Sequence, residues 1–141
     1  MADNGILDDA EIARIKEALS RVPFATLLGI ELEHAERGSA TLRLNIHDEL
    51  RQIHGVMHGG AIASLIDTAT AFAILTLLED REKFSTVDLM VNYLRPLQEG
   101  TATARARVLR AGRRVITASA DVFDDGGNLA ATALSTYLRL A

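Results

Sequence analysis

The chain has 141 residues, no cysteine and a formal net charge of −4 at pH 7. This length suits one domain with a sizeable core, and the lack of cysteine excludes disulfides, thiol nucleophiles and thiolate metal sites. The acidic balance gives no electrostatic argument for nucleic-acid binding. The first nine residues lack the basic and apolar regions of a signal peptide, so we expect a cytoplasmic protein.

The first half of the chain is predicted to hold two helices and two strands. Asp8, Asp9 and Glu11 precede an apolar stripe, as is typical of a helix N-terminus. Strict alternation of apolar and polar residues over 40–47 indicates a strand with one buried face. The expected elements, in chain order, are a helix from Asp8 that ends before Pro23, strands over 27–36 and 40–47, a loop over 48–57 and a long helix over 59–78.

Four strands are predicted to follow a charged connection at residues 79–83. They cover 84–95, 101–110, 114–123 and 129–140. Their links are short and turn-like, which favours an antiparallel meander, because parallel crossovers need about a dozen residues or more. The order of elements predicts an α+β domain in which one sheet covers one helix, with 1–22 as an N-terminal helix and lead-in and 23–141 as the main domain.

The predicted helix over 59–78 is apolar on nearly every side. Its length would suit a membrane span, but Asp67 near its middle would cost about 3 kcal/mol on insertion scales, and amphipathic strand patterns flank it. We therefore expect a buried helix of a soluble protein. One sheet from a chain this short covers one side of the helix. A second copy is expected to cover the other side, with Asp67 at or near the subunit boundary.

Residues 58–67 carry the strongest indication of chemistry. Gly59 and Gly60 open the helix and leave backbone N–H groups at its positive end, where developing negative charge is stabilised. Asp67 is the only ionisable residue between Gly59 and Leu78, and a charge in such a stretch is costly unless it has partners or a function. An N–H donor and a nearby carboxylate together favour acyl-transfer hydrolysis.

The motif around this helix start resembles that of a known family. Gln-Ile-His-Gly-Val-Met-His-Gly-Gly at residues 52–60, followed by Leu-Ile-Asp at 65–67, is similar to the signature of hotdog-fold acyl-CoA thioesterases of the phenylacetic-acid-degradation (PaaI-like) type. The similarity covers nearly all of 23–141, including Val-Asp-Leu at 87–89 and Asn-Tyr-Leu-Arg-Pro at 92–96. It implies a hotdog fold, in which an antiparallel sheet wraps a long central helix. It also implies a homodimer, usually paired into a tetramer, with the active site across the dimer boundary.

The resemblance further implies roles for four residues. Asp67 takes the position of the catalytic carboxylate, as general base on water or as nucleophile, and Gly59 supplies the N–H that polarises the thioester carbonyl. Gln52 falls where the family usually has Asn, a side chain that helps to hold the water or the carboxylate. Thr86 falls where some members have a water-orienting Ser. Gly59 and Gln52 of one chain would serve one site together with Asp67 and Thr86 of its partner.

Further residues are expected to bind the substrate. His58 and Gly60 stand at the helix start, and His58 is expected to fix the loop by hydrogen bonding. Coenzyme A carries phosphates, which arginine binds in a bidentate way. Arg95 and Arg113, the latter with its arginine neighbours in the turn 110–114, are the candidates for this contact.

A metal site is the alternative interpretation of His54 and His58, which stand four residues apart. No Glu or third His stands at ligand spacing, so we expect neither a metal nor another cofactor. The sequence thus predicts a thioester hydrolase acting on a small aryl- or medium-chain acyl-CoA. The alternatives are a non-catalytic acyl-CoA-binding or sensor protein of the same fold and, with less support, a hotdog dehydratase.

Overall fold

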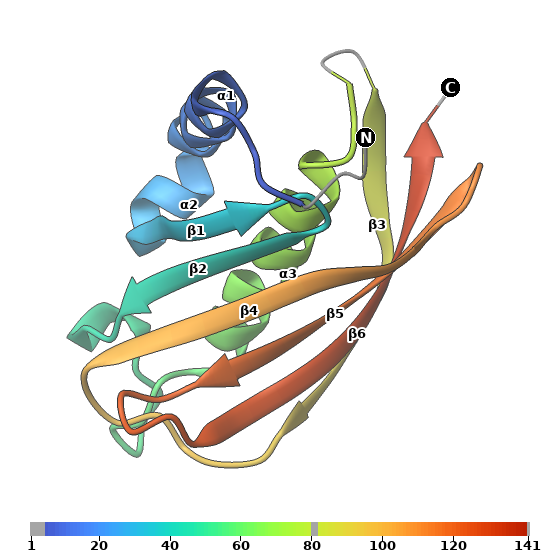
Figure 1. Ribbon diagram of the computed structural model, residues 1–141. Helices are drawn as coiled ribbons and strands as arrows, with labels where there is room; N and C mark the ends of the chain where they lie inside the picture. Colours follow the sequence, from blue (N-terminus) through green and yellow to red (C-terminus); the bar gives the residue numbers. More distant parts are fainter. Residues whose placement is uncertain (1–4, 80–81, 141) are drawn as a thin grey trace.

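The fold is built around one long helix that lies across a curved sheet. The computed structural model describes residues 5–79 and 82–140, and in it α3 (Gly59–Leu75) crosses the concave face of a six-stranded sheet (Figure 1). All strand pairs are antiparallel, so the predicted α+β architecture is confirmed. The strands are β1 (Ile30–Glu36), β2 (Ser39–Asn45), β3 (Lys83–Tyr93), β4 (Thr101–Ala111), β5 (Val115–Phe123) and β6 (Leu129–Leu140).

Two short helices precede the sheet, α1 (Asp9–Ser20) and α2 (Pro23–Leu28). The sequence predicts α1 but not α2, because a proline at position 23 indicates the end of a preceding helix. Proline is also favoured at the first position of a helix, where its missing N–H costs nothing. The predicted strand over 27–36 is therefore wrong at its start, since Gly29 ends α2 with a left-handed φ of +83° and β1 begins directly after it.

The strand order β1-β2-β4-β5-β6-β3 corrects the predicted meander of the last four strands. β4, β5 and β6 pair consecutively, but β3 pairs with β6 and stands at the edge of the sheet. Residues 94–100 carry the chain from β3 past the ends of β6 and β5 to β4 (Figure 1). Such a link reaches about 23 Å, whereas three strand spacings are only about 14 Å. The short connection 94–100 is therefore long enough to join β3 to β4 although these two strands are not neighbours in the sheet.

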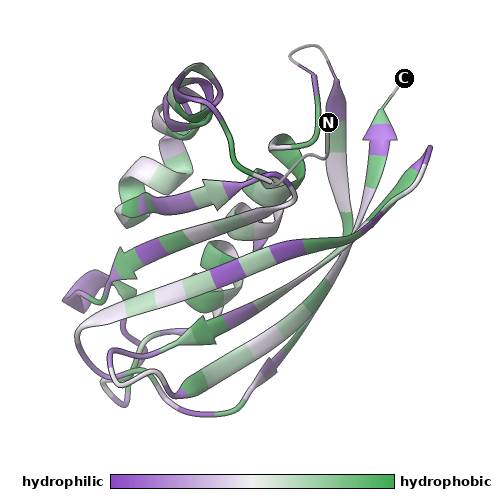
Figure 2. Ribbon diagram, viewed as in Figure 1, coloured by the Kyte–Doolittle hydropathy of each residue, from purple (hydrophilic) through white to green (hydrophobic). Residues whose placement is uncertain are grey.

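Alanines line much of the sheet face that covers α3. The buried alanines of β4, β5 and β6 are Ala102, Ala104, Ala106, Ala118, Ala120, Ala130, Ala131 and Ala133. These short side chains let α3, which is largely apolar in Figure 2, pack close to the sheet, where Ile66 and Ala69 are completely buried.

No helix in the described part of the chain is long and apolar enough to cross a membrane. Ser64, Asp67 and Ala71 are only partly buried, so one side of α3 lies open in the single chain.

β3 is the edge strand beside β6 and is exposed along most of its length. Its register against β6 shifts between Thr86 and Asp88, so Val87 is an extra, bulged residue. Thr86 and Tyr93 stand an odd number of residues apart, and strict alternation would put them on opposite faces. Because of the bulge, both face α3, and one strand presents side chains to the start and to the middle of that helix.

Candidate active site

The start of α3 offers a backbone donor. His58 is the N-cap, and its Nδ1 accepts a hydrogen bond from the Gly60 N–H at 2.8 Å. The expected fixing of the loop by His58 is thus confirmed, and the Gly60 N–H is taken up by this bond. The Gly59 N–H has no hydrogen-bond acceptor among the described residues. Because the helix dipole adds positive potential at this end, the Gly59 N–H can receive a developing negative charge.

Tyr93 packs directly on Gly59. Its hydroxyl donates to the Gly59 carbonyl at 2.9 Å, and a Cβ placed on Gly59 would come within 3.3 Å of the Tyr93 ring. Any side chain at Gly59 would therefore push the ring away. Sequence reasoning did not select Tyr93, because the bulge that turns it toward α3 leaves no clear mark in the sequence.

A cavity of about 290 Å³ opens beside Gly59. Its polar lining comes from Gln52, Gly59, Tyr93 and Arg95. The Gln52 Oε1 accepts a hydrogen bond from the His54 N–H, and Gln52 Nε2 has no acceptor among the described residues. Because Oε1 is occupied, the Nε2 donors are the part of the Gln52 amide that is free to bind a ligand in the cavity. Three predicted site residues, Gln52, Gly59 and Arg95, meet at this one cavity.

Asp67 lies on the open side of α3, where hydroxyl groups of the sheet hold its carboxylate. Its Oδ1 accepts hydrogen bonds from Thr86 Oγ1 on β3 at 2.9 Å and from Tyr137 Oη on β6 at 3.1 Å. Thr86 and Tyr137 are register partners on neighbouring strands. Within the described residues no Lys, Arg or His side chain is hydrogen-bonded or ion-paired to Asp67. The predicted proximity of Asp67 and Thr86 is confirmed, and the donors that hold the carboxylate are neutral.

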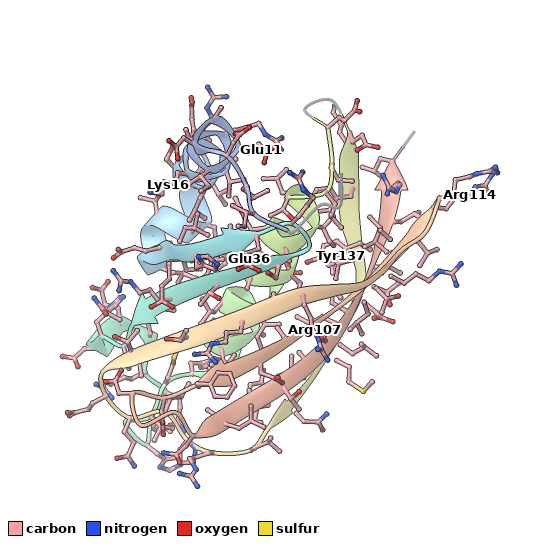
Figure 3. The ribbon with its side chains drawn as sticks, viewed as in Figure 1. Glu11, Lys16, Glu36, Arg107, Arg114 and Tyr137 are labelled. Atoms are coloured by element: carbon pink, nitrogen blue, oxygen red, sulfur yellow. The ribbon has the colours of Figure 1, made fainter. Side chains whose placement is uncertain are left out.

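Tyr137 is the part of this site that sequence reasoning missed. The side chain is 1% exposed and lies between the sheet and α3 (Figure 3), with its hydroxyl 2.6 Å from Thr70 Oγ1. Burial raises the pKa of Tyr137 from its ordinary 10 to about 12, and the charge of Asp67 adds to this effect. The sequence offered one indication of this role. Tyr137 is a large side chain at an inward position of β6, whereas the neighbouring inward residues of that strand are small.

The Gly59 donor and the Asp67 carboxylate form two separate half-sites in one chain. They stand eight residues apart on α3, which is about 12 Å along a helix. A thioester carbonyl must lie within hydrogen-bond distance of its donor and about as close to the attacking group. The two half-sites of a single chain therefore cannot act on the same carbonyl.

Arg113 and Arg95 lie near opposite ends of β3. Arg113 is in the β4–β5 turn, where it lines a cavity of about 630 Å³ with Arg110 and Arg114, and a second cavity there also contains Lys83. Figure 3 shows Arg114 at the tip of this turn, away from Tyr137. Lys83 begins β3, whereas Arg95 follows its end. A single chain does not bring the two predicted phosphate-binding arginines together.

The alternative metal site at His54 and His58 has no further ligands in the structure. Within residues 5–79 and 82–140, no group of three or more His, Asp or Glu side chains is placed to hold a metal ion. His58 Nδ1 is already the acceptor of the Gly60 N–H. Its role here is that of a helix cap.

Comparison with known proteins identifies the family. The family model described as Thioesterase superfamily matches residues 54–131. The chain is 30% identical to SSO1253 of Saccharolobus solfataricus, over 98% of this chain and 91% of that one. It is 33% identical to the medium/long-chain acyl-CoA thioesterase YigI of Salmonella typhimurium, with 83% and 85% covered. A phenylacetic acid degradation-related protein from Ralstonia eutropha has a similar structure, with a TM-score of 0.82, 30% identity, and 91% of this chain and 98% of that one covered.

The chain therefore belongs to the Thioesterase superfamily and is a thioester hydrolase of the hotdog fold and PaaI-like type, as the motif at residues 52–67 predicted. Its fold matches that of a thioesterase family protein from Silicibacter pomeroyi with a TM-score of 0.85, at 28% identity and with 92% of this chain and 98% of that one covered. The activity is thus settled at the level of thioester hydrolysis.

Tyr137 predicts a loss of stability at high pH. Its pKa in the folded chain, about 12, is above that of an unfolded tyrosine, near 10. The stabilisation is therefore fully present below pH 10 and is lost as the pH rises toward 12, where the free energy of unfolding should fall by about 2 to 3 kcal/mol through this group. Urea unfolding between pH 8 and 11.5 measures it. The Tyr137→Phe variant should show a shallower decline, and an identical decline in both proteins would contradict the prediction.

Proposed function

We propose that this thioesterase hydrolyses a small aryl- or medium-chain acyl-CoA to the free acid and coenzyme A. The observation that carries the proposal is the pair of half-sites, a free N–H at a helix start and a carboxylate held by hydroxyls. The printed name of the YigI relative, a medium/long-chain acyl-CoA thioesterase, supports the substrate class. The cavity beside Gly59, with its arginine and its apolar residues Met57 and Ile62, suits a thioester with an anionic carrier.

The proposed mechanism assigns one task to each half-site. The Gly59 N–H and the Gln52 amide donate to the thioester oxygen as it becomes an oxyanion. Asp67 takes a proton from water as water attacks the carbonyl carbon, or attacks that carbon itself and is released by water later. Either route breaks the C–S bond and releases the CoA thiolate, which takes up a proton. Thr86 holds Asp67 through Oδ1 during the reaction.

A dimer through the edge strand β3 would join the two half-sites. Antiparallel pairing of two β3 strands about a two-fold axis near Leu89 and Met90 places Thr86 of one chain opposite Tyr93 of the other. Tyr93 is bonded to Gly59 and Thr86 to Asp67. Each Gly59 would then lie beside the Asp67 of the partner subunit, and the pairing would also cover the free edge of β3.

The same pairing would bring together the arginines that one chain separates. The Lys83 end of one β3 would meet the Tyr93 end of its partner, and with it Arg95. Arg113 adjoins the Lys83 end. Arg95 and Arg113 of the partner subunit would therefore flank one substrate and offer two guanidinium groups to the phosphates of coenzyme A.

A tetramer would use the outer face of the sheet. Met90 faces Leu134 across the β3–β6 pair, and Val115 faces Leu138 across the β5–β6 pair. All four side chains are at least 40% exposed, and all belong to neighbouring strands. Contiguous exposed apolar residues of this kind are typical of association surfaces. We expect two dimers to pack through this face.

Asp67→Asn should lower the rate of thioester hydrolysis about 100-fold or more, because a placed base contributes that much, while the isosteric amide preserves the fold. A panel of acyl- and aryl-CoA esters with a thiol-trapping dye measures the rate, and circular dichroism checks the fold. Asp88→Asn, at an exposed carboxylate on β3 that faces Thr136, is the matched control and should keep the parent rate. A parent protein that hydrolyses no ester of the panel would overturn the substrate class. An Asp67→Asn variant with the parent rate would overturn the mechanism.

Heterodimers of two inactive variants should recover activity if the site is shared. Asp67→Asn removes the carboxylate. Gly59→Pro removes the N–H at a helix position that tolerates proline, and it also shifts the Tyr93 ring of the same half-site. In a heterodimer purified through two different tags, one site contains both lesions and the other contains neither. About half the parent activity per dimer is expected from this symmetry. If both half-sites acted within one chain, the heterodimer would be as inactive as the homodimer of either single variant.

Arg95→Ala and Arg113→Ala should each raise KM several-fold with little change in kcat, because a phosphate contact is the same in the ground and transition states. Salt screens such contacts over about 8 Å, so both variants should also show a flatter dependence of KM on ionic strength. Arg21→Ala, at the exposed C-cap of α1, is the control. Unchanged KM and salt dependence in both site variants would assign the phosphates to other groups.

A further inference from the structure

The two oxygens of the Asp67 carboxylate have different surroundings. Oδ1 accepts two hydrogen bonds, from Thr86 Oγ1 at 2.9 Å and Tyr137 Oη at 3.1 Å. Oδ2 accepts none from the described residues. A carboxylate held through one oxygen keeps the other available for a reacting atom. The hydroxyls that hold Oδ1 therefore determine which oxygen does the chemistry.

The position of the Tyr137 proton follows from counting donors. Tyr137 has one hydroxyl proton and three acceptors within reach: Thr70 Oγ1 at 2.6 Å, the Asp67 carbonyl at 2.9 Å and Asp67 Oδ1 at 3.1 Å. If Tyr137 donated to Thr70, its own lone pairs would face two oxygens of Asp67. If Thr70 donates to Tyr137, the Tyr137 proton is directed toward Asp67, where the ionised carboxylate strengthens the bond. The Thr70 hydroxyl also lies 3.1 Å from the Ile66 carbonyl and 3.2 Å from the Asp67 carbonyl, which compete for its proton. Its contact with Tyr137 is the shortest of the three, and the charge of Asp67 favours a chain from Thr70 to Tyr137 to Asp67.

Tyr137 is well placed to fix an orientation. It is completely buried in β6, its ring meets Phe84 edge-on at 5.6 Å between centroids, and its register partner is Thr86. Two hydroxyls from facing positions of paired strands therefore approach Oδ1 from the sheet. The Tyr137 hydroxyl is held in place by the burial of its ring, whereas the exposed Thr86 side chain loses rotamer freedom on forming its bond.

We propose that Tyr137, supported by Thr70, is a positioning residue that fixes the Asp67 carboxylate through Oδ1, so that Oδ2 is the oxygen that acts on water or on the thioester. The proposal rests on the assignment of Asp67 as the catalytic carboxylate under the proposed function. Tyr137 does not touch the substrate. It acts on the rate only through the orientation and the charge of Asp67.

The Tyr137→Phe variant tests the proposal, since it removes one oxygen and keeps the ring against Phe84. We expect kcat on the best acyl-CoA ester of the panel to fall about 10-fold or more with KM nearly unchanged. Losing a donor to the ionised carboxylate disfavours that form, so the acidic limb of the kcat profile should move to higher pH. A structural role alone would lower stability without moving this limb.

Thr70→Val and Ser135→Ala complete the experiment. Thr70→Val is nearly isosteric and removes only the supporting hydroxyl, so it should lower kcat less than Tyr137→Phe does. The double variant should be no worse than Tyr137→Phe alone, because the two residues act as one unit. Ser135 is the matched control. It is also completely buried in β6, but its hydroxyl donates to the Asp88 carbonyl at 3.0 Å and not to Asp67, so its variant should keep the parent kcat and acidic limb.

The outcomes separate this proposal from the function on which it rests. An Asp67→Asn variant with parent activity removes the catalytic assignment itself. An inactive Asp67→Asn variant beside a Tyr137→Phe variant with parent kcat and pH profile overturns the positioning role alone. The same holds if Ser135→Ala reproduces every effect of Tyr137→Phe. Should Tyr137→Phe fail to fold, Thr70→Val decides, because an unchanged kcat and acidic limb in that variant contradicts the hydroxyl chain.

Discussion

The site is governed by a distance along a rigid helix. Gly59 and Asp67 lie on the same straight element, about 12 Å apart by its rise per residue, and neither end can shift toward the other. The start of α3 is capped by His58 and covered by Tyr93, while Asp67 is bonded to the sheet. This distance supports our proposal that each site takes residues from two chains, with the exposed edge strand β3 as the element through which the second chain would add its half.

The inner face of the sheet explains how residues of the sheet reach the Asp67 carboxylate on α3. Small side chains on β4, β5 and β6 let α3 approach closely over most of its length. Larger residues, Ile116 and Tyr137, fill the space toward its C-terminal end, where they pack with Ile74. A tyrosine there is long enough to pass the backbone of α3 and reach the Asp67 side chain. The hydroxyl donors thus depend on the change from alanine to large residues along the sheet.

Sequence reasoning was most successful where one local pattern determined one structure. Gly59 and Asp67 belong to one helix, so their spacing in the sequence was enough to predict how they lie relative to one another. It failed where partners came from distant segments. The pairing of β3 with β6 depends on which edge strand of the sheet is still unpaired. The residues of the connection 94–100 do not indicate which strand that is. The bulge at Val87 reverses the alternation that sequence reasoning relies on, and with it the side on which Tyr93 lies.

The choice of neutral donors around Asp67 has an electrostatic consequence. A lysine or arginine in the position of Tyr137 would stabilise the ionised carboxylate by its full charge and weaken it as a base or nucleophile. Hydroxyls fix its orientation at a smaller cost in reactivity, since a neutral donor brings no full positive charge to the carboxylate. Within the described residues the arginines expected to bind phosphate, Arg95 and Arg113, are neither hydrogen-bonded nor ion-paired to Asp67, so the carboxylate keeps its neutral donors in the single chain.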